Sequence, residues 1–166
     1  MVRSPDVGPD ARKDRHGAPV TPVDAAWRRA VRLLAARDRS THEIRVRLEA
    51  AGTAPDIVVA TITRLRELRY LDDERFARTA AENAVRRGHG SERVRAALAA
   101  KGVAEALADA AVTTAFADEP ALAQAALTRR FPAPPREPRD RARAARFLLQ
   151  RGFPEAVVLT ILGEGC

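Results

Sequence analysis

Apolar residues recur at helical spacing from residue 22 onward, and this pattern predicts a protein built from α-helices. The segment 25–38 reads AAWRRAVRLLAARD and turns one apolar face inward, made of Trp27, Ala30, Val31 and Leu34. A second helix is expected from the capping-box spacing of Ser40 and Glu43 to the stop at Gly52. A third is expected over 54–70, with inward positions at Ile57 or Val58, Thr61, Ile62, Leu65 and Leu68.

The same pattern then returns twice at a spacing of fifty residues. Gly52, Gly102 and Gly152 are evenly spaced, and a leucine stands four residues before each of them. Four further columns around these positions are apolar in every copy. A repeat of this length is typical of stacked helical units that bury their apolar faces on one another. Each glycine is expected to end a helix with a left-handed backbone.

We therefore expect an all-α fold of three tandem three-helix units, similar to helix-turn-helix modules, in an elongated array. The predicted units are 22–70, 71–118 and 119–166. A disordered tail is expected over 1–21, which mixes Pro, Gly and charges without an apolar period. The Pro-rich connector 131–139 interrupts the repeat in the third unit, so a hinge or altered packing is expected there.

The stretch YLDDERFA, residues 70–77, sets three carboxylates side by side and has two interpretations. Residues 72–74 would suit an acid/base or metal centre, but such a centre needs further ligands, and the nearest histidine is a helix and a loop away. The same residues are typical of a helix start, with Asp72 as the N-cap. We interpret the cluster as structural, with Leu71 and Phe76 forming a hydrophobic staple.

The turn RRGHGS, residues 86–91, is a second candidate for chemistry. A glycine-rich loop that opens a helix can hold a phosphate on free backbone amides. Gly88 and Gly90 match no nucleotide-binding motif, however, and no strand precedes them. We interpret Gly88 as a helix C-cap and Ser91 as the start of the next helix. The turn amides and the neighbouring arginines remain candidates for contact with a nucleic-acid phosphate.

Composition supports the helical prediction and adds a strong positive charge. The 166 residues are 46% hydrophobic but only 4% aromatic, which favours helices over sheets. The net charge is +7, and 27 of the 29 basic residues are arginine. The charge is uneven, because the segment 103–120 has no Lys or Arg and four acidic residues. Arginines off the apolar faces of several other helices predict a surface for a polyanion.

Other functional classes find little support in the sequence. The single cysteine, Cys166, and three scattered histidines offer neither a disulfide framework nor zinc-ligand spacing. No apolar run approaches the roughly 18 residues that a membrane helix needs. The N-terminus lacks the apolar core of a secretion signal. We expect a cytoplasmic protein that is no enzyme and needs no metal or cofactor.

The stretch YLDDERFA, followed by RRGHGSERVRAALAAKGV, resembles the central signature of the RecX family, bacterial regulators of the RecA recombinase. In that family a Leu-Asp-Asp-x-Arg-Phe element precedes an arginine–glycine turn, a helix and a Lys-Gly pair. These elements fall here on Leu71, Asp72, Asp73, Arg75, Phe76, Gly88, Lys101 and Gly102. The segment 30–52 is similar to the family's first repeat, and the resemblance spans residues 23–165.

The resemblance implies a curved array that lies in the groove of the RecA filament on single-stranded DNA. Such a protein modulates, and usually inhibits, the ATPase, recombinase and co-protease activities of RecA. The implied roles are in DNA repair, DNA recombination and the SOS response. The expected partners are RecA and single-stranded DNA, with duplex DNA as a further candidate, and we expect a monomer. The alternative is a helix-turn-helix DNA-binding protein that acts without RecA.

Two sets of residues follow as candidates. The residues expected to contact RecA or DNA are Arg75, Arg78, Arg86, Arg87, Arg93, Arg95 and Lys101. The residues expected to form the structural signature are Leu71, Asp72, Asp73, Phe76, Gly52, Gly88, Gly102 and Gly152.

Overall fold

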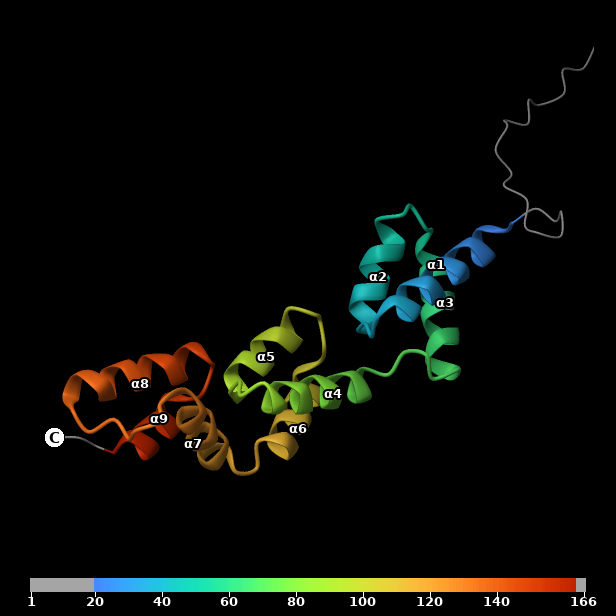
Figure 1. Ribbon diagram of the computed structural model, residues 1–166. Coiled ribbons are helices and arrows are strands. Elements are labelled where there is room, and N and C mark those ends of the chain that lie inside the picture. Colours follow the sequence, from blue (N-terminus) through green and yellow to red (C-terminus); the bar gives the residue numbers. More distant parts are fainter. Residues whose placement is uncertain (1–19, 164–166) are drawn as a thin grey trace, which may run out of the picture.

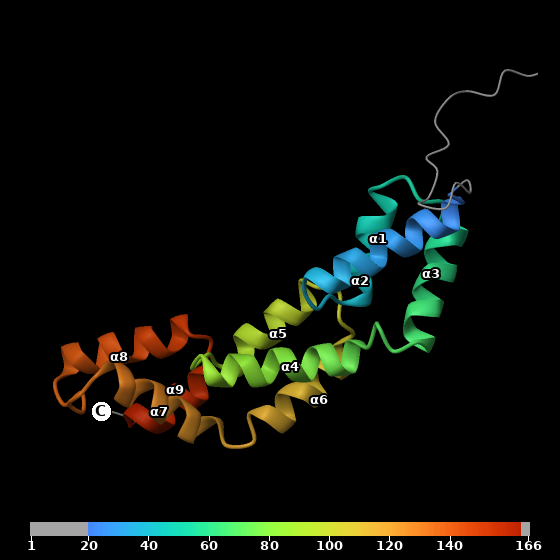
Figure 2. The same cartoon turned by 45° about the vertical axis from the view of Figure 1, so that its right-hand side comes forward.

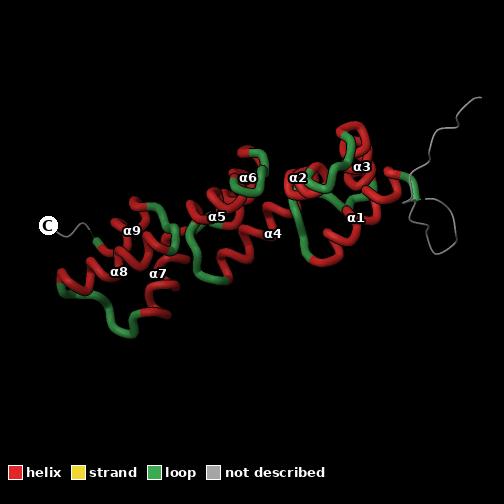
Figure 3. The backbone as a smooth tube through the Cα atoms, turned by 90° about the horizontal axis from the view of Figure 1, so that it is seen from above, coloured by secondary structure: helices red, strands yellow, loops and turns green. Residues whose placement is uncertain are grey.

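The computed structural model describes residues 20–163, and within this range the chain forms nine α-helices and no strand (Figure 3). The predicted all-α fold is confirmed. The tail predicted over 1–21 lies outside the described residues except for its last two, of which Thr21 caps the first helix. The helices are α1 (Pro22–Ala36), α2 (Thr41–Glu49), α3 (Pro55–Glu67), α4 (Asp73–Arg86), α5 (Ser91–Ala99), α6 (Glu105–Ala115), α7 (Glu119–Arg130), α8 (Pro138–Gln150) and α9 (Glu155–Leu162).

The helices form three units of three, which lie in a row (Figures 1 and 2). Close packing of one helix on another occurs within each unit, α1–α3, α4–α6 and α7–α9. Each unit has its own apolar core. The leucines of one repeat column, Leu48, Leu98 and Leu148, are all buried in these cores. The internal repeat therefore marks equivalent core positions in successive units.

Local sequence signals explain where the helices begin and end. The Ser40 hydroxyl accepts from the Glu43 amide and the Glu43 carboxylate accepts from the Ser40 amide, so the predicted capping box is present. Gly52, Gly102 and Gly152 follow the middle helices with φ of +76°, +65° and +81°. The left-handed backbone predicted at these glycines is confirmed.

The end of α3 differs from the prediction. The periodicity places Leu68 inward, but this side chain is 52% exposed. The reason is that α3 ends at Glu67 and the chain then reverses through Arg69, whose φ is +57°. The reversal carries Leu71 back into the core of the first unit, where it is buried.

The Pro-rich connector joins α7 to α8 inside the third unit, and it is longer than its counterparts. It covers residues 131–137, two fewer than the sequence suggests, because Pro138 and Arg139 already belong to α8. Proline suits the first helical position, where the missing N–H has no intrahelical acceptor in any case. The equivalent loops of the other units are only 37–40 and 87–90.

The units meet through helix ends and turns. At the first junction, the Ser40 hydroxyl at the start of α2 donates to the Lys101 carbonyl in the turn between α5 and α6, at 2.6 Å. At the second, the Gly90 amide at the start of α5 donates to the Arg151 carbonyl between α8 and α9, at 2.9 Å. Both pairs are related by the fifty-residue repeat, so the two junctions use equivalent positions, although the donor is a hydroxyl at the first and a backbone amide at the second.

The second junction requires glycine at position 90, and this requirement can be tested. A Cβ added to Gly90 would lie 2.2 Å from the carbonyl oxygen of Gly152. The φ of Gly90 is −89°, so the cost of a side chain there is steric. We expect Gly90→Ala to displace the third unit from the second, which small-angle X-ray scattering would detect as a changed curve.

The matched control is Gly52→Ala. Its added Cβ has no atom within 4 Å, but its φ of +76° is unfavourable for alanine. We expect a loss of about 1 kcal/mol in the free energy of unfolding and an unchanged scattering curve. A Gly90→Ala protein that scatters like the wild type would contradict the proposed docking.

Candidate functional site: the junctions and the basic surface

The carboxylates of the YLDDERFA stretch serve two helix starts. Asp72 caps its own helix, since its Oδ1 accepts from the Arg75 amide at 2.9 Å. Asp73 instead reaches the first unit, where its Oδ1 accepts from the Thr41 amide at 2.8 Å. The structural interpretation of Asp72 as an N-cap is confirmed. The second helix start, served by Asp73, is a contact that the sequence reasoning missed.

The second junction repeats this arrangement. Asp118 caps α7 by accepting from the Ala121 amide at 3.1 Å. The next residue, Glu119, accepts from the Ser91 amide of the second unit at 2.7 Å. In both units, therefore, the first of two adjacent acids caps its own helix and the second caps the middle helix of the preceding unit. This shared acidic pair is the sequence signal that would have revealed the contact.

Glu43 is a further acidic member of the first junction. Its carboxylate accepts from Arg37 at 2.7 Å and lies 3.9 Å from the Lys101 Nζ. Burial alone would raise the pKa of Glu43, but the hydrogen bonds from Arg37 and the Ser40 amide, with the charge of Lys101, hold this pKa below its ordinary value. One carboxylate thus pairs with two cations at this junction and offsets part of their charge.

Three of the candidate contact residues interact with another segment of the chain. The Lys101 Nζ lies over the Phe76 ring, 5.1 Å from its centroid. Arg95 forms an ion pair with Asp109 on α6 at 2.9 Å. Arg75 donates to a backbone carbonyl in the turn before α4, at 3.3 Å. These cations point toward the first unit, toward α6 and toward the α3–α4 turn, so they do not converge on one point.

The other four candidates, which are exposed like Arg75 and Arg95, are Arg78, Arg86, Arg87 and Arg93. Arg86 hydrogen-bonds to Asn83 one turn earlier on α4. The backbone and Cβ of Arg93 pack beside Gly152, so this residue lies next to the third unit. The exposed candidates therefore run from α4 to the second junction.

Leu71 and Phe76 contribute to two different cores. Leu71 is buried in the first unit, whereas Phe76 is half-buried and packs against the core of the second. Leu71 lies in the α3–α4 turn and Phe76 in the first turn of α4. The predicted hydrophobic staple between them is wrong, because each side chain packs against a different core.

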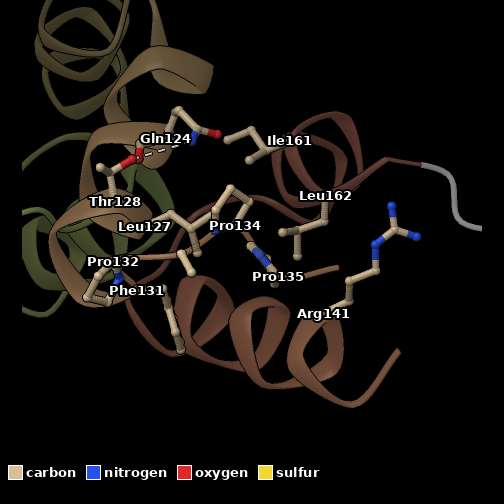
Figure 4. A pocket seen from close by; sticks show the side chains of 11 residues that line it. Gln124, Leu127, Thr128, Phe131, Pro132, Pro134, Pro135, Arg141, Ile161 and Leu162 are labelled. Carbon is tan, nitrogen blue, oxygen red and sulfur yellow. Dashed lines mark hydrogen bonds between the residues drawn. The ribbon is translucent and has the colours of Figure 1, made fainter. Parts of the chain in front are cut away.

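A pocket of about 240 Å³ lies beneath the connector of the third unit (Figure 4). Its walls are mainly apolar, and they include Leu127, Phe131, Ile161 and Leu162, with Arg141 at one side. No carboxylate or imidazole lines this pocket, so it offers no general acid or base. Across residues 20–163, no three His, Cys, Asp or Glu side chains are grouped in a way that could hold a metal ion.

No helix between residues 20 and 163 combines the length and apolar character that crossing a membrane requires.

The architecture defines the chain as a tandem array of three-helix units with an arginine-rich surface. Models of a known protein family match two of these units. The first three-helix domain of RecX matches residues 26–65, and the second matches residues 72–112. The chain belongs to the RecX family.

Curated relatives match over most of their length. The regulatory protein RecX of Chromohalobacter salexigens is 41% identical over 124 residues, which cover 75% of this chain and 82% of the relative. The regulatory protein RecX of Thermus thermophilus is 38% identical over 130 residues, covering 78% and 84%.

Solved structures share the fold. The crystal structure of RecX from Lactobacillus salivarius superimposes with a TM-score of 0.71 at 19% identity, covering 85% of this chain and 94% of that one. A crystal structure of a regulatory protein RecX gives a TM-score of 0.69 at 24% identity, covering 84% and 71%. The arrangement of helical units is therefore common to these proteins.

The cap between units can be tested by removing Asp73. Asp73→Ala deprives the buried start of α2 of its acceptor, and we expect a loss of about 0.5–2 kcal/mol in the free energy of unfolding. Glu74→Ala removes an exposed neighbouring carboxylate and should change the free energy of unfolding by less than about 0.5 kcal/mol. Chemical denaturation of both variants provides the measurement. Equal effects would show that Asp73 has no special role.

His89 predicts a pH dependence of stability. Burial lowers the pKa of His89, and the charges of Arg93, Arg151 and Arg87 lower it further. His89 takes up a proton in the unfolded chain near its ordinary pKa of about 6.5, whereas in the folded chain it does so only at lower pH. The free energy of unfolding therefore decreases as the pH falls from about 6.5 toward the lowered pKa of the folded chain. We expect thermal melts of His89→Asn to depend less on pH than those of wild type between about pH 7.5 and 5.5. Identical pH profiles would contradict this.

Proposed function

We propose that this chain is a non-catalytic regulator that binds RecA and the RecA filament on single-stranded DNA. It inhibits the ATPase, recombinase and co-protease activities of RecA, and it acts in the cytoplasm in DNA repair, recombination and the SOS response. Membership of the RecX family supports this proposal. The net charge of +7 supports the part that concerns DNA.

The repeated junction is the observation that carries the proposal. It joins three small units into one extended row, so each unit can touch a different part of a long partner. Contacts that are weak singly then combine, because binding of one unit raises the effective concentration of the next. Four exposed arginines of the second unit suit such contacts with phosphates, and they are Arg78, Arg86, Arg87 and Arg93.

The alternative, a helix-turn-helix protein that reads duplex DNA without RecA, fits these units less well. Base readout in that class uses the first turn of the recognition helix. The third helices begin here with acidic first turns, at Asp56 in α3, Glu105 in α6 and Glu155 in α9. These carboxylates would face phosphates of the same charge. The starts of α2 and α5 are occupied by the junctions.

The proposed function is tested by titrating the chain into RecA of the same organism on single-stranded DNA. We expect the DNA-dependent ATPase rate to fall as the chain approaches an equimolar ratio to RecA. Gly52→Ala, which keeps the array, should inhibit like wild type, whereas Gly90→Ala, which displaces the third unit, should inhibit less. An ATPase rate unchanged across the full titration with folded protein would count against the proposal. A footprint on duplex DNA without RecA would favour the alternative.

A further inference from the structure

A second pocket lies where the third unit meets the second. It has a volume of about 170 Å³, and its lining includes Gly88 and Phe147. The charged residues around it are all arginines, and they are Arg87, Arg129, Arg130 and Arg151. We call these four residues the arginine cup. Three of them lie outside the set that the sequence suggested as contact residues.

The cup holds more positive charge than its surroundings offset. Within residues 20–163, none of the four arginines forms an ion pair with a carboxylate. Three helices, α4, α7 and α8, end beside the pocket, since the lining residues come from their last turns. Each helix C-terminus carries about −0.5 charge, so three ends supply about −1.5 against four positive charges. A surplus of about +2.5 remains.

The arginine cup uses few of its N–H donors in hydrogen bonds within the chain. Arg151 donates one bond to the Arg87 carbonyl at 3.0 Å, and Arg129 donates one to the Ala125 carbonyl at 3.3 Å. The side chains of Arg87 and Arg130 donate none to described residues. Each guanidinium has five N–H donors, so most of the donors remain available for an anion.

The first junction shows that this surplus is not a general property of the fold. The repeat aligns Arg37 with Arg87, Glu43 with Arg93 and Lys101 with Arg151. In the first junction the two cations share the carboxylate of Glu43. In the second junction that acid is replaced by another arginine, and α7 adds Arg129 and Arg130. The first junction thus has a carboxylate that offsets part of its positive charge, whereas the second junction has an arginine at the equivalent position.

We propose that the arginine cup binds a phosphate of the backbone of single-stranded DNA. This inference rests on the proposed function and gives it a specific site. Guanidinium groups suit phosphate oxygens because their planar fork donates two parallel hydrogen bonds. The ring of Phe147, under Arg151 at 5.1 Å, holds one guanidinium in place without consuming its donors.

The test uses the full chain and a fluorescently labelled thymidine oligonucleotide, with anisotropy measured across a potassium chloride series. The cup variant is Arg129→Gln with Arg130→Gln, because neither residue bonds across the junction. The control is Arg136→Gln with Arg139→Gln, which removes the same charge from the end of the connector and the first turn of α8. Arg139 lies about 18 Å from Arg151 along the helix. Thermal melts establish that both variants fold, and Arg130→Gln alone serves if the double variant does not.

We expect the slope of log affinity against log salt to fall by about 0.7 for each phosphate that the cup variant no longer binds, and to stay near wild type in the control. An unchanged slope in the cup variant overturns the inference. An equal change in both variants also overturns it, because it would assign the effect to net charge. Stabilisation by inorganic phosphate beyond that of chloride at equal ionic strength, with DNA binding unchanged in the cup variant, would assign the cup to free phosphate and overturn the DNA assignment.

The RecA titration separates this inference from the proposed function. If the wild-type chain inhibits RecA but the cup variant keeps the wild-type salt slope of DNA binding, the arginine cup does not bind the phosphate and the proposed function is unaffected. If the cup variant has a reduced salt slope of DNA binding but the wild-type chain does not affect RecA, the proposed function is wrong and the assignment of the arginine cup is unaffected.

Discussion

The second and third units each supply a carboxylate to the first amide of the middle helix in the preceding unit, and the arrangement of the whole array depends on these contacts. The first amides of a helix have no acceptor within the helix. Thr41 and Ser91 are buried at the junctions, so their amides need a partner from elsewhere in the protein, and Asp73 and Glu119 provide it. Leaving such a group unpaired costs about 1–3 kcal/mol, which is large for units whose helices do not pack closely across the junctions.

The sequence predicts most of the fold because the signals involved are local. The capping box at Ser40 and the N-cap at Asp72 act within four residues, and the repeat in the glycine and leucine columns reveals the units. The bond from Thr41 to Asp73 could not be predicted in this way, because it joins residues 32 apart in different units. Leu68 was misplaced because periodicity continues a helix past the point where Arg69 reverses the chain.

The candidate site depends on differences between the copies of the repeat. At the first junction Glu43 pairs with both Arg37 and Lys101 and offsets part of their charge. The equivalent position in the next unit is Arg93, and the second junction becomes strongly basic. A count of arginines predicts a partner with negative charge, but only the pocket between the ends of α4, α7 and α8 identifies which arginines lie together.

Amide hydrogen exchange measured by NMR tests the central claim most directly. If carboxylates of the following units cap α2 and α5, the amides of Thr41 and Ser91 should exchange slowly, unlike those of Asp56 and Glu105 at the exposed starts of α3 and α6. Exchange at Thr41 and Ser91 as fast as at Asp56 and Glu105 would contradict the account, because the caps that join the units would then be absent in solution.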